Sequence, residues 1–240
     1  MRLRAGTSGF SFEGWRGTFY PADLPTGEWL RFYAERLSAV EINNTFYRMP
    51  KADLLRGWAD QVAGQAGFGF ALKAPRRLTH VARLGPEAAQ GVEHLCRVAA
   101  ALGPCLGPLL FQLPPTLRRD LDRLRELLAL VPAGLRVAVE FRHASWDEPE
   151  VDEALASAGA ARVVSETDTG PAPTVLQPGS WGYLRLRRAD YDDAALRQWL
   201  ERLAATGWSE AWVFFKHEED GLGPRLAARL LELRGATSSG

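Results

Sequence analysis

The sequence predicts a single (β/α)8 barrel of the TIM type. Segments typical of strands and of helices alternate along the chain, and eight segments are strand-like. The length of 240 residues is close to the ~250 residues that eight β/α units need. Few breaks look like domain linkers, and a doubly wound open sheet is the less favoured alternative. We therefore expect one domain over residues 1–234 and a disordered tail over residues 235–240.

The expected strands are short apolar runs. They cover residues 3–6, 39–43, 68–73, 108–113, 135–141, 161–165, 181–186 and 211–216. Nearly every strand is followed by apolar residues at helical spacing, most regularly over 118–130. The expected helices cover residues 28–37, 52–62, 86–102, 118–130, 149–158, 192–205 and 224–233. The main irregularity falls in 166–180, a Pro-rich segment where we expect the sixth helix to be missing or replaced by a loop.

Composition excludes several classes of function. The chain has 29 basic and 29 acidic residues and a formal net charge of zero, so nucleic acid is a partner that we do not favour. No apolar run approaches ~18 residues, and the N-terminus lacks an apolar signal segment. We expect a cytoplasmic protein with no membrane partner. Cys96 and Cys105 lack a zinc-type spacing and are expected to be reduced structural thiols. The oligomeric state is not predicted.

Rare residue types mark the ends of predicted strands. The chain has 26 Arg but only three Lys, and Lys73 and Lys216 both end strands. Its only two asparagines, Asn43 and Asn44, follow its only isoleucine, Ile42. A compositional bias of this kind replaces Lys, Asn and Ile wherever other residues serve equally well. The remaining ones therefore point to the carboxyl ends of the strands as the place of function.

Strand alternation indicates which side chains point into the mouth of the barrel. Successive side chains face opposite sides, and a charged residue on a barrel strand is expected to face inward near the solvent. Active sites of this fold form at that end. Nine polar or charged residues are expected there: Glu41, Asn43, Lys73, Gln112, Glu140, Arg142, Arg185, Arg187 and Lys216. The alternative is a structural network that pairs Glu41 with Lys73, and Glu140 with Lys216 or Arg142.

Two motifs near the N-terminus have two interpretations each. Gly6-Thr7-Ser8-Gly9 follows the first strand, and its Thr7 and Ser8 could bind an anion or simply form a tight turn. The aromatic loop 10–20 could stack on a ring or base, or form a lid that packs on itself. Arg16 lies in this loop and could hold an anion in either case.

His143 follows Glu140 and Arg142, and it could act as an acid or base or as a structural residue at a helix end.

A divalent metal is the less favoured use of the acidic and histidine residues near strand ends, because Lys73, Arg142 and Lys216 would oppose a cation. Those possible ligands are Glu41, Glu140, Glu166, Asp168, His143 and His217. We expect neither a metal nor a cofactor.

The strand-end motifs together resemble one known family. They are Gly6-Thr7-Ser8-Gly9-Phe10 with Trp15-Arg16-Gly17 and Phe19-Tyr20-Pro21, Glu41-Ile42-Asn43-Asn44-Thr45-Phe46-Tyr47, Lys73-Ala74-Pro75 with Thr79-His80, Gln112-Leu113-Pro114-Pro115, Glu140-Phe141-Arg142-His143 with Ser145-Trp146, and Phe214-Phe215-Lys216-His217-Glu218. The chain resembles the domain of unknown function 72 (YecE-like) family over almost its whole length. The resemblance implies a TIM barrel but no activity. Many members have Asn-Asn after the aromatic end of strand eight and His-Gly after strand seven. This chain has Lys216-His217 and Arg187-Arg188, which add positive charge to the mouth.

The favoured function is an enzyme for a small anionic substrate carrying phosphate or carboxylate. Arg142, Lys73, Lys216 and Arg185 would hold the anion, and Glu41 or Glu140 would move a proton. Asn43 would orient the substrate. Glu140→Gln is expected to abolish turnover and leave the fold intact. The alternatives are a nucleic-acid-processing or nucleic-acid-binding protein and a non-catalytic ligand sensor that uses the same pocket.

Overall fold

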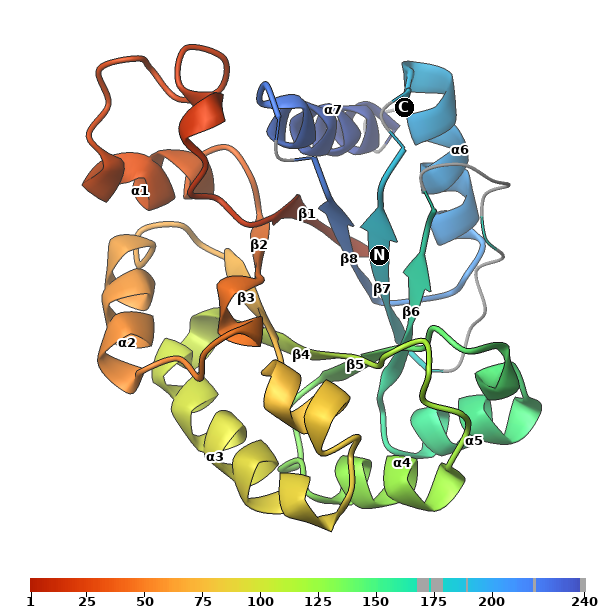
Figure 1. The fold of residues 1–240 in the computed structure, drawn as a ribbon. Helices are drawn as coiled ribbons and strands as arrows, with labels where there is room; N and C mark the ends of the chain where they lie inside the picture. Colours follow the sequence, from red (N-terminus) through yellow and green to blue (C-terminus); the bar gives the residue numbers. More distant parts are fainter. Residues whose placement is uncertain (168–172, 174–178, 189, 218, 238–240) are drawn as a thin grey trace.

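The computed structural model describes residues 1–167, 173, 179–188, 190–217 and 219–237, and it confirms the predicted (β/α)8 barrel. Eight parallel strands form one closed barrel in chain order, with β8 paired to β1. The helices surround the strands (Figure 1). The strands are β1 (Arg2–Ser8), β2 (Ala39–Ile42), β3 (Gly69–Lys73), β4 (Leu106–Gln112), β5 (Val137–Glu140), β6 (Ala161–Ser165), β7 (Trp181–Leu186) and β8 (Glu210–Phe215).

The helices lie where apolar periodicity predicts them, with boundaries that shift by a few residues. Over the described residues they are α1 (Trp29–Ala34), α2 (Ala52–Gln61), α3 (Ala89–Ala99), α4 (Leu121–Ala129), α5 (Pro149–Ser157), α6 (Asp193–Ala204) and α7 (Leu222–Thr237). The helix expected at 86–102 is divided into 3-10 turns that flank α3. Helix α7 includes residues 235–237, the first part of the segment expected to be a disordered tail. The expected loss of the sixth helix falls on 168–172 and 174–178, outside the described residues.

Alternate strand positions face the interior of the barrel, as the period of two predicts. Val40 and Ile42 pack in the large apolar cluster beneath the helices. The interior holds a separate buried cluster, formed by Ala39, Ala71, Leu110, Ala138, Ala161, Val163, Trp181, Tyr183, Trp212 and Phe214. Because these side chains fill the centre, the barrel is a packed core and not a channel.

Strands β1 and β2 approach each other closely at Gly6. A Cβ at this position would lie 1.7 Å from the carbonyl oxygen of Ala39, so only glycine fits. Two residues later the register pairs Ser8 with Glu41. The glycine thereby brings Ser8 beside a buried carboxylate at the mouth.

The amino-terminal end of the barrel is closed by Trp212. Its indole occupies the space next to Gly69 and Gly107, where a Cβ would meet the ring at 2.5 and 2.4 Å. The guanidinium of Arg4 lies 4.6 Å from the centre of the Trp212 ring system and forms an ion pair with Glu210. These contacts seal the base beneath the interior cluster.

The aromatic loop packs mainly on itself. Trp15 and Tyr20 are buried, and Tyr20 stacks on Trp29 with ring centres 4.8 Å apart and an interplanar angle of 6°. Phe10 and Phe12 instead line the mouth. Most of the loop therefore belongs to the core, and only its start can contact a ligand. No helix in the described part of the chain is long and apolar enough to cross a membrane.

Candidate active site

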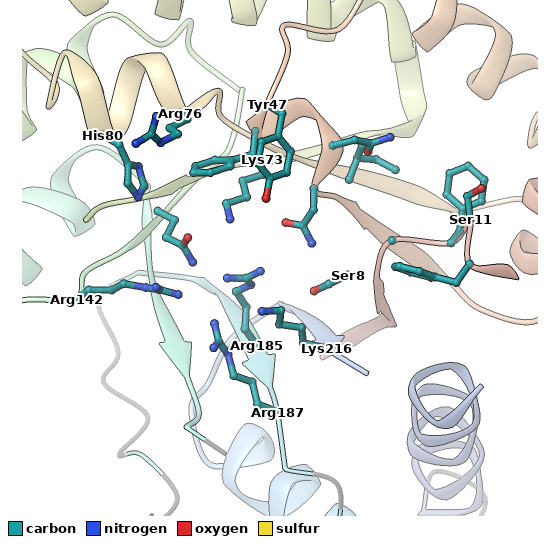
Figure 2. A pocket seen from close by; sticks show the side chains of 18 residues that line it. Ser8, Ser11, Tyr47, Lys73, Arg76, His80, Arg142, Arg185, Arg187 and Lys216 are labelled. Atoms are coloured by element: carbon teal, nitrogen blue, oxygen red, sulfur yellow. The ribbon is translucent and has the colours of Figure 1, made fainter. Parts of the chain in front are cut away.

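A pocket of about 760 Å³ lies at the carboxyl ends of the strands, and we call it the mouth pocket. Its volume is in the range of small-molecule sites, ~300–1,000 Å³. Figure 2 shows Lys73 facing Arg185 and Lys216 across it, with Arg142 at one side. Its described lining contains no aspartate or glutamate but has six cationic side chains: Lys73, Arg76, Arg142, Arg185, Arg187 and Lys216.

A buried ion network forms the floor of the mouth pocket. Arg185, on β7, donates from Nη1 to Glu140 Oε2 at 2.7 Å and from Nη2 to Glu41 Oε1 at 2.9 Å. All three side chains are at most 2% exposed. One guanidinium thus joins the ends of β2, β5 and β7, and we call this group the Glu41–Arg185–Glu140 triad.

The observed ion pairs differ from those that the sequence suggests. The structural-network alternative paired Glu41 with Lys73 and Glu140 with Lys216 or Arg142. The pair of Glu41 with Lys73 does not form, because Arg185 binds both carboxylates. The pair between Arg142 and Glu140 is confirmed, with Nε 3.1 Å from Oε1. Barrel closure explains the difference, because it brings β7 opposite strands that are distant in the sequence.

Neutral donors complete the hydrogen bonding of both carboxylates. Glu41 accepts from Ser8 Oγ at 2.8 Å and from the Tyr183 hydroxyl at 2.6 Å. Glu140 accepts from Gln112 Nε2 at 2.8 Å. Burial raises the pKa of each carboxyl, but Arg185 and these donors outweigh it, so the pKa of Glu41 is lowered and that of Glu140 falls to about 2. Both groups are therefore ionised at neutral pH.

Tyr183→Phe is expected to cost about 2 kcal/mol of unfolding free energy, because it removes a buried hydrogen bond to a charged acceptor. Urea denaturation at neutral pH measures this loss. The matched control is Tyr47→Phe, since the Tyr47 side chain is 83% exposed and its hydroxyl lies in solvent. Equal stability of the two variants would show that the Tyr183 hydroxyl contributes nothing to the network.

Lys73 ends β3 and points into the mouth pocket. It is 9% exposed, and its Nζ lies 4.2 Å from the centre of the Phe46 ring. Burial, and then the charge of Arg185, lower the pKa of Lys73 to about 8. Two positive charges side by side in a buried site favour loss of the proton from the amine. An amine with a pKa of about 8 can exchange a proton close to neutral pH.

Asn43, which follows β2, also lines the pocket. Its Oδ1 is buried and has no hydrogen-bond partner among the described residues. An unsatisfied buried acceptor is costly unless a ligand or water supplies a donor. This arrangement suits the substrate-orienting role predicted for Asn43. Gln112 and Ser8 also line the pocket, but each donates to a carboxylate of the floor.

Sequence reasoning missed the residues that the connecting loops bring to the pocket. A short π-helix over Arg77–Val81 carries His80, whose ring packs edge-on against Phe46 with centres 5.1 Å apart. Burial, followed by the charge of Lys73, lowers the pKa of His80. Arg76, Asn44 and Tyr47 line the pocket as well. Strand alternation ends before these positions, and the sequence indicated Asn44, Tyr47 and His80 only through residue rarity and the family motifs.

Besides Glu41 and Glu140, which lie beneath the mouth pocket, three predicted site residues do not line it. The Thr7 hydroxyl is buried and donates to the carbonyl of Gly9 at 2.6 Å. Arg16 bonds Glu13 and the carbonyl of Leu24 at 2.8 and 2.9 Å, so packing within the aromatic loop occupies it. His143 Nδ1 accepts from the backbone N–H of Ser145 at 3.1 Å and caps a 3-10 turn.

The possible metal ligands are not gathered into one cluster. Among the described residues, no group of three or more His, Cys, Asp or Glu side chains could hold a metal ion. Glu166 accepts from the Tyr191 hydroxyl, and His217 Nε2 contacts the carbonyl oxygen of Arg187 at 2.9 Å. Asp168 lies outside the described residues. The oxygens of Glu41 and Glu140 already accept from Arg185 and the neutral donors.

Comparison with known proteins places the chain in one family. Residues 4–240 match the family described as "Protein of unknown function DUF72". The chain belongs to the DUF72 family. It is also 30% identical over 144 residues to the "UPF0759 protein YecE" of Escherichia coli K12, an alignment that covers 58% of this chain and 52% of that protein. The chain thus spans about half the length of the curated relatives that it matches.

Solved structures of similar proteins share the barrel. A DUF72 protein from Thermotoga maritima has a TM-score of 0.80 and 25% identity, covering 98% of this chain and 100% of its own. A xylose isomerase-like TIM barrel from Mycobacterium smegmatis, solved in complex with magnesium, has a TM-score of 0.57 and 12% identity over 98% of this chain and 97% of its own. The second likeness concerns the fold alone.

Proposed function

We propose that this DUF72 protein is an enzyme that binds a small phosphate- or carboxylate-bearing substrate in the mouth pocket. The observation that carries the proposal is the cationic lining of the pocket. Six cationic side chains line it, and no carboxylate does among the described lining residues. The two glutamates beneath are already bound by Arg185. The lining would therefore attract an anion.

The proposal assigns proton transfer to Lys73 in place of Glu41 or Glu140. A carboxylate whose pKa lies far below neutral is a weak base, and Glu140 is such a group because Arg185 holds it ionised. Lys73, with a pKa of about 8, can take up and release a proton near neutral pH. Arg142 and Lys216 would hold the anionic group, and Asn43 would accept a hydrogen bond from the substrate.

Anion binding is expected to appear as a thermal shift. Inorganic phosphate, pyrophosphate and citrate, each tested at low ionic strength, should raise Tm by about 5 °C at one hundred times Kd. The shift should shrink in Arg142→Gln and Lys216→Gln, because each variant removes a charge from the pocket. Arg118→Gln is the control, since it makes the same charge change at an exposed position outside the pocket.

Two outcomes would contradict the proposal. One is that none of these anions raises Tm. The other is that the anions raise Tm equally in the pocket variants and in the control. A short single-stranded oligonucleotide belongs in the same screen. If it alone binds, the nucleic-acid alternative replaces the small substrate, although the buried rings of Trp15 and Tyr20 cannot stack on a base.

A further inference from the structure

Lys73 differs from the other cations of the mouth pocket in its surroundings. The Lys73 side chain is largely buried, and its Nζ packs on the face of the Phe46 ring. No carboxylate of the described residues forms an ion pair with Nζ, because the nearby Glu41 and Glu140 are bound by Arg185. A buried ammonium without a paired anion is costly. The site therefore favours a neutral amine, or one that a ligand compensates.

The backbone that carries this amine is held in place by neighbouring strands and a turn. Lys73 is the last residue of β3 and pairs with Leu110 of β4. The Thr45 hydroxyl donates to its carbonyl oxygen at 2.7 Å, which attaches the turn that carries Phe46 to the end of β3. A nucleophile held on a strand end keeps its geometry better than one on a loop. Figure 2 shows the side chain entering the space that Arg142, Arg185 and Lys216 face.

We propose that Lys73 is a nucleophile that forms an imine with a small carbonyl compound bearing a phosphate or carboxylate group. This inference rests on the proposed function, because the surrounding cations would hold the anionic group while the carbonyl carbon lies against Nζ. It adds a covalent step and restricts the substrate to aldehydes and ketones that carry an anion.

The covalent step balances without an oxidant or a reductant. The lone pair of the neutral Lys73 amine forms a bond to the carbonyl carbon. One amine proton moves to the carbonyl oxygen and gives a carbinolamine. The second amine proton leaves with that oxygen as water when the carbon–oxygen bond breaks. The resulting imine takes a proton from solvent and becomes a cation that withdraws electrons from the adjacent carbon.

The low lysine content of the chain makes the test unusually clear. The sequence contains only Lys51, Lys73 and Lys216. Lys51 and Lys216 are exposed, and Lys216 lies in the same pocket. These two side chains and the N-terminal amine serve as internal controls for reactivity without any substitution. Peptide mapping by mass spectrometry can then assign an adduct to each amine separately.

The experiment incubates the full chain with sodium cyanoborohydride and one of two matched probe pairs. Dihydroxyacetone phosphate is compared with dihydroxyacetone, and pyruvate with hydroxyacetone, so each anion has a neutral partner. The reductant delivers hydride to the imine carbon and leaves a stable secondary amine. We expect the anionic probes to label Lys73 at least about tenfold more than Lys51 or Lys216, because its amine is more often neutral near pH 7. The two anionic probes distinguish a phosphate from a carboxylate ligand.

Further measurements separate an imine-forming site from general amine reactivity. The rate of Lys73 labelling should rise with pH and level off above about 8, where the amine is mostly neutral. Excess inorganic phosphate should slow labelling by occupying the pocket. Lys73→Arg keeps the charge but is a poor nucleophile, so the adduct should be lost. If this variant does not fold, the site distribution in the unsubstituted chain still decides the question.

The proposal is overturned if labelling is equal at the three lysines, or if neutral probes label Lys73 as well as anionic ones. Failure of this inference differs from failure of the proposed function. If phosphate raises Tm but no adduct forms at Lys73, the pocket binds anions and only the imine is wrong. If neither phosphate nor citrate binds, the anion-binding proposal itself falls.

Discussion

Arg185→Met is expected to destabilise the protein by about 5 kcal/mol or more at neutral pH, since removing one partner of a buried ion pair typically costs about 3–5 kcal/mol. Here one guanidinium serves two carboxylates, Glu41 and Glu140, which are both buried. The variant would leave two negative charges together in the core. A typical domain has only about 5–15 kcal/mol of stability, so much of the chain should be unfolded.

The pH dependence of this variant identifies the cause. Without Arg185, burial raises the pKa of both carboxyls above their unfolded values. A group of that kind contributes most stability below its unfolded pKa and loses it as pH rises. Arg185→Met should therefore be more stable near pH 4 than at pH 7. Urea denaturation monitored by circular dichroism at both pH values measures the difference.

Arg125→Met is the matched control for this substitution. Arg125 forms an exposed ion pair with Asp122, with side chains 60% and 90% exposed, and such pairs contribute at most about 1 kcal/mol. If Arg185→Met is no less stable than this control, the triad does not hold the barrel together as its geometry implies.

Acid is expected to remove about 3 kcal/mol of stability through Glu140 alone. Its pKa is about 2 in the folded protein against an ordinary value of 4.5, and each pH unit between the folded and the unfolded pKa corresponds to about 1.4 kcal/mol. Because the folded pKa is the lower one, this contribution is complete above pH 4.5 and is lost as pH falls toward 2. Glu41, whose pKa is also lowered, acts in the same direction.

Glu140→Gln tests the contribution of this carboxylate to stability, and the triad changes the effect that we expect from the variant. The sequence suggested that this variant would keep its fold intact, but a neutral glutamine side chain at this position would leave Arg185 one carboxylate short. We expect the variant to lose about 3 kcal/mol of unfolding free energy at pH 7. Its difference in unfolding free energy from the unsubstituted protein should be smaller at pH 3. Glu126→Gln, at an exposed position on α4, should change stability by less than about 0.5 kcal/mol. If the two proteins differ in unfolding free energy by the same amount at pH 7 and at pH 3, the acid sensitivity does not come from Glu140.

The period of two along the strands accounts for what the sequence could predict. It oriented Glu41, Lys73, Gln112, Glu140 and Arg185 correctly, because successive side chains of a barrel strand alternate between the interior and the helices. The charged ends of strands could therefore be assigned to one site from the sequence alone.

The partners of these residues could not be predicted in the same way. Arg185 lies 144 and 45 residues from the two glutamates that it binds. Only β6 separates β7 from the strand of Glu140, but the strand of Glu41 comes near β7 only when the barrel closes through β8 and β1. His80 and Tyr47 follow strand ends, where the alternation no longer applies. His143 lies outside the mouth pocket, and its Nδ1 accepts a local capping bond from Ser145 that no strand pattern reveals. Loop geometry is set by such local bonds, and the sequence pattern does not specify them.

The sealed base of the barrel determines how molecules enter and leave. Because Trp212 and the interior cluster fill the barrel, the pocket is closed at its base. A ligand would enter and leave it through the mouth. A product that keeps the anionic group of its substrate would leave against the same cations that drew the substrate in. Release would then limit turnover, and accumulated product would act as a competitive inhibitor.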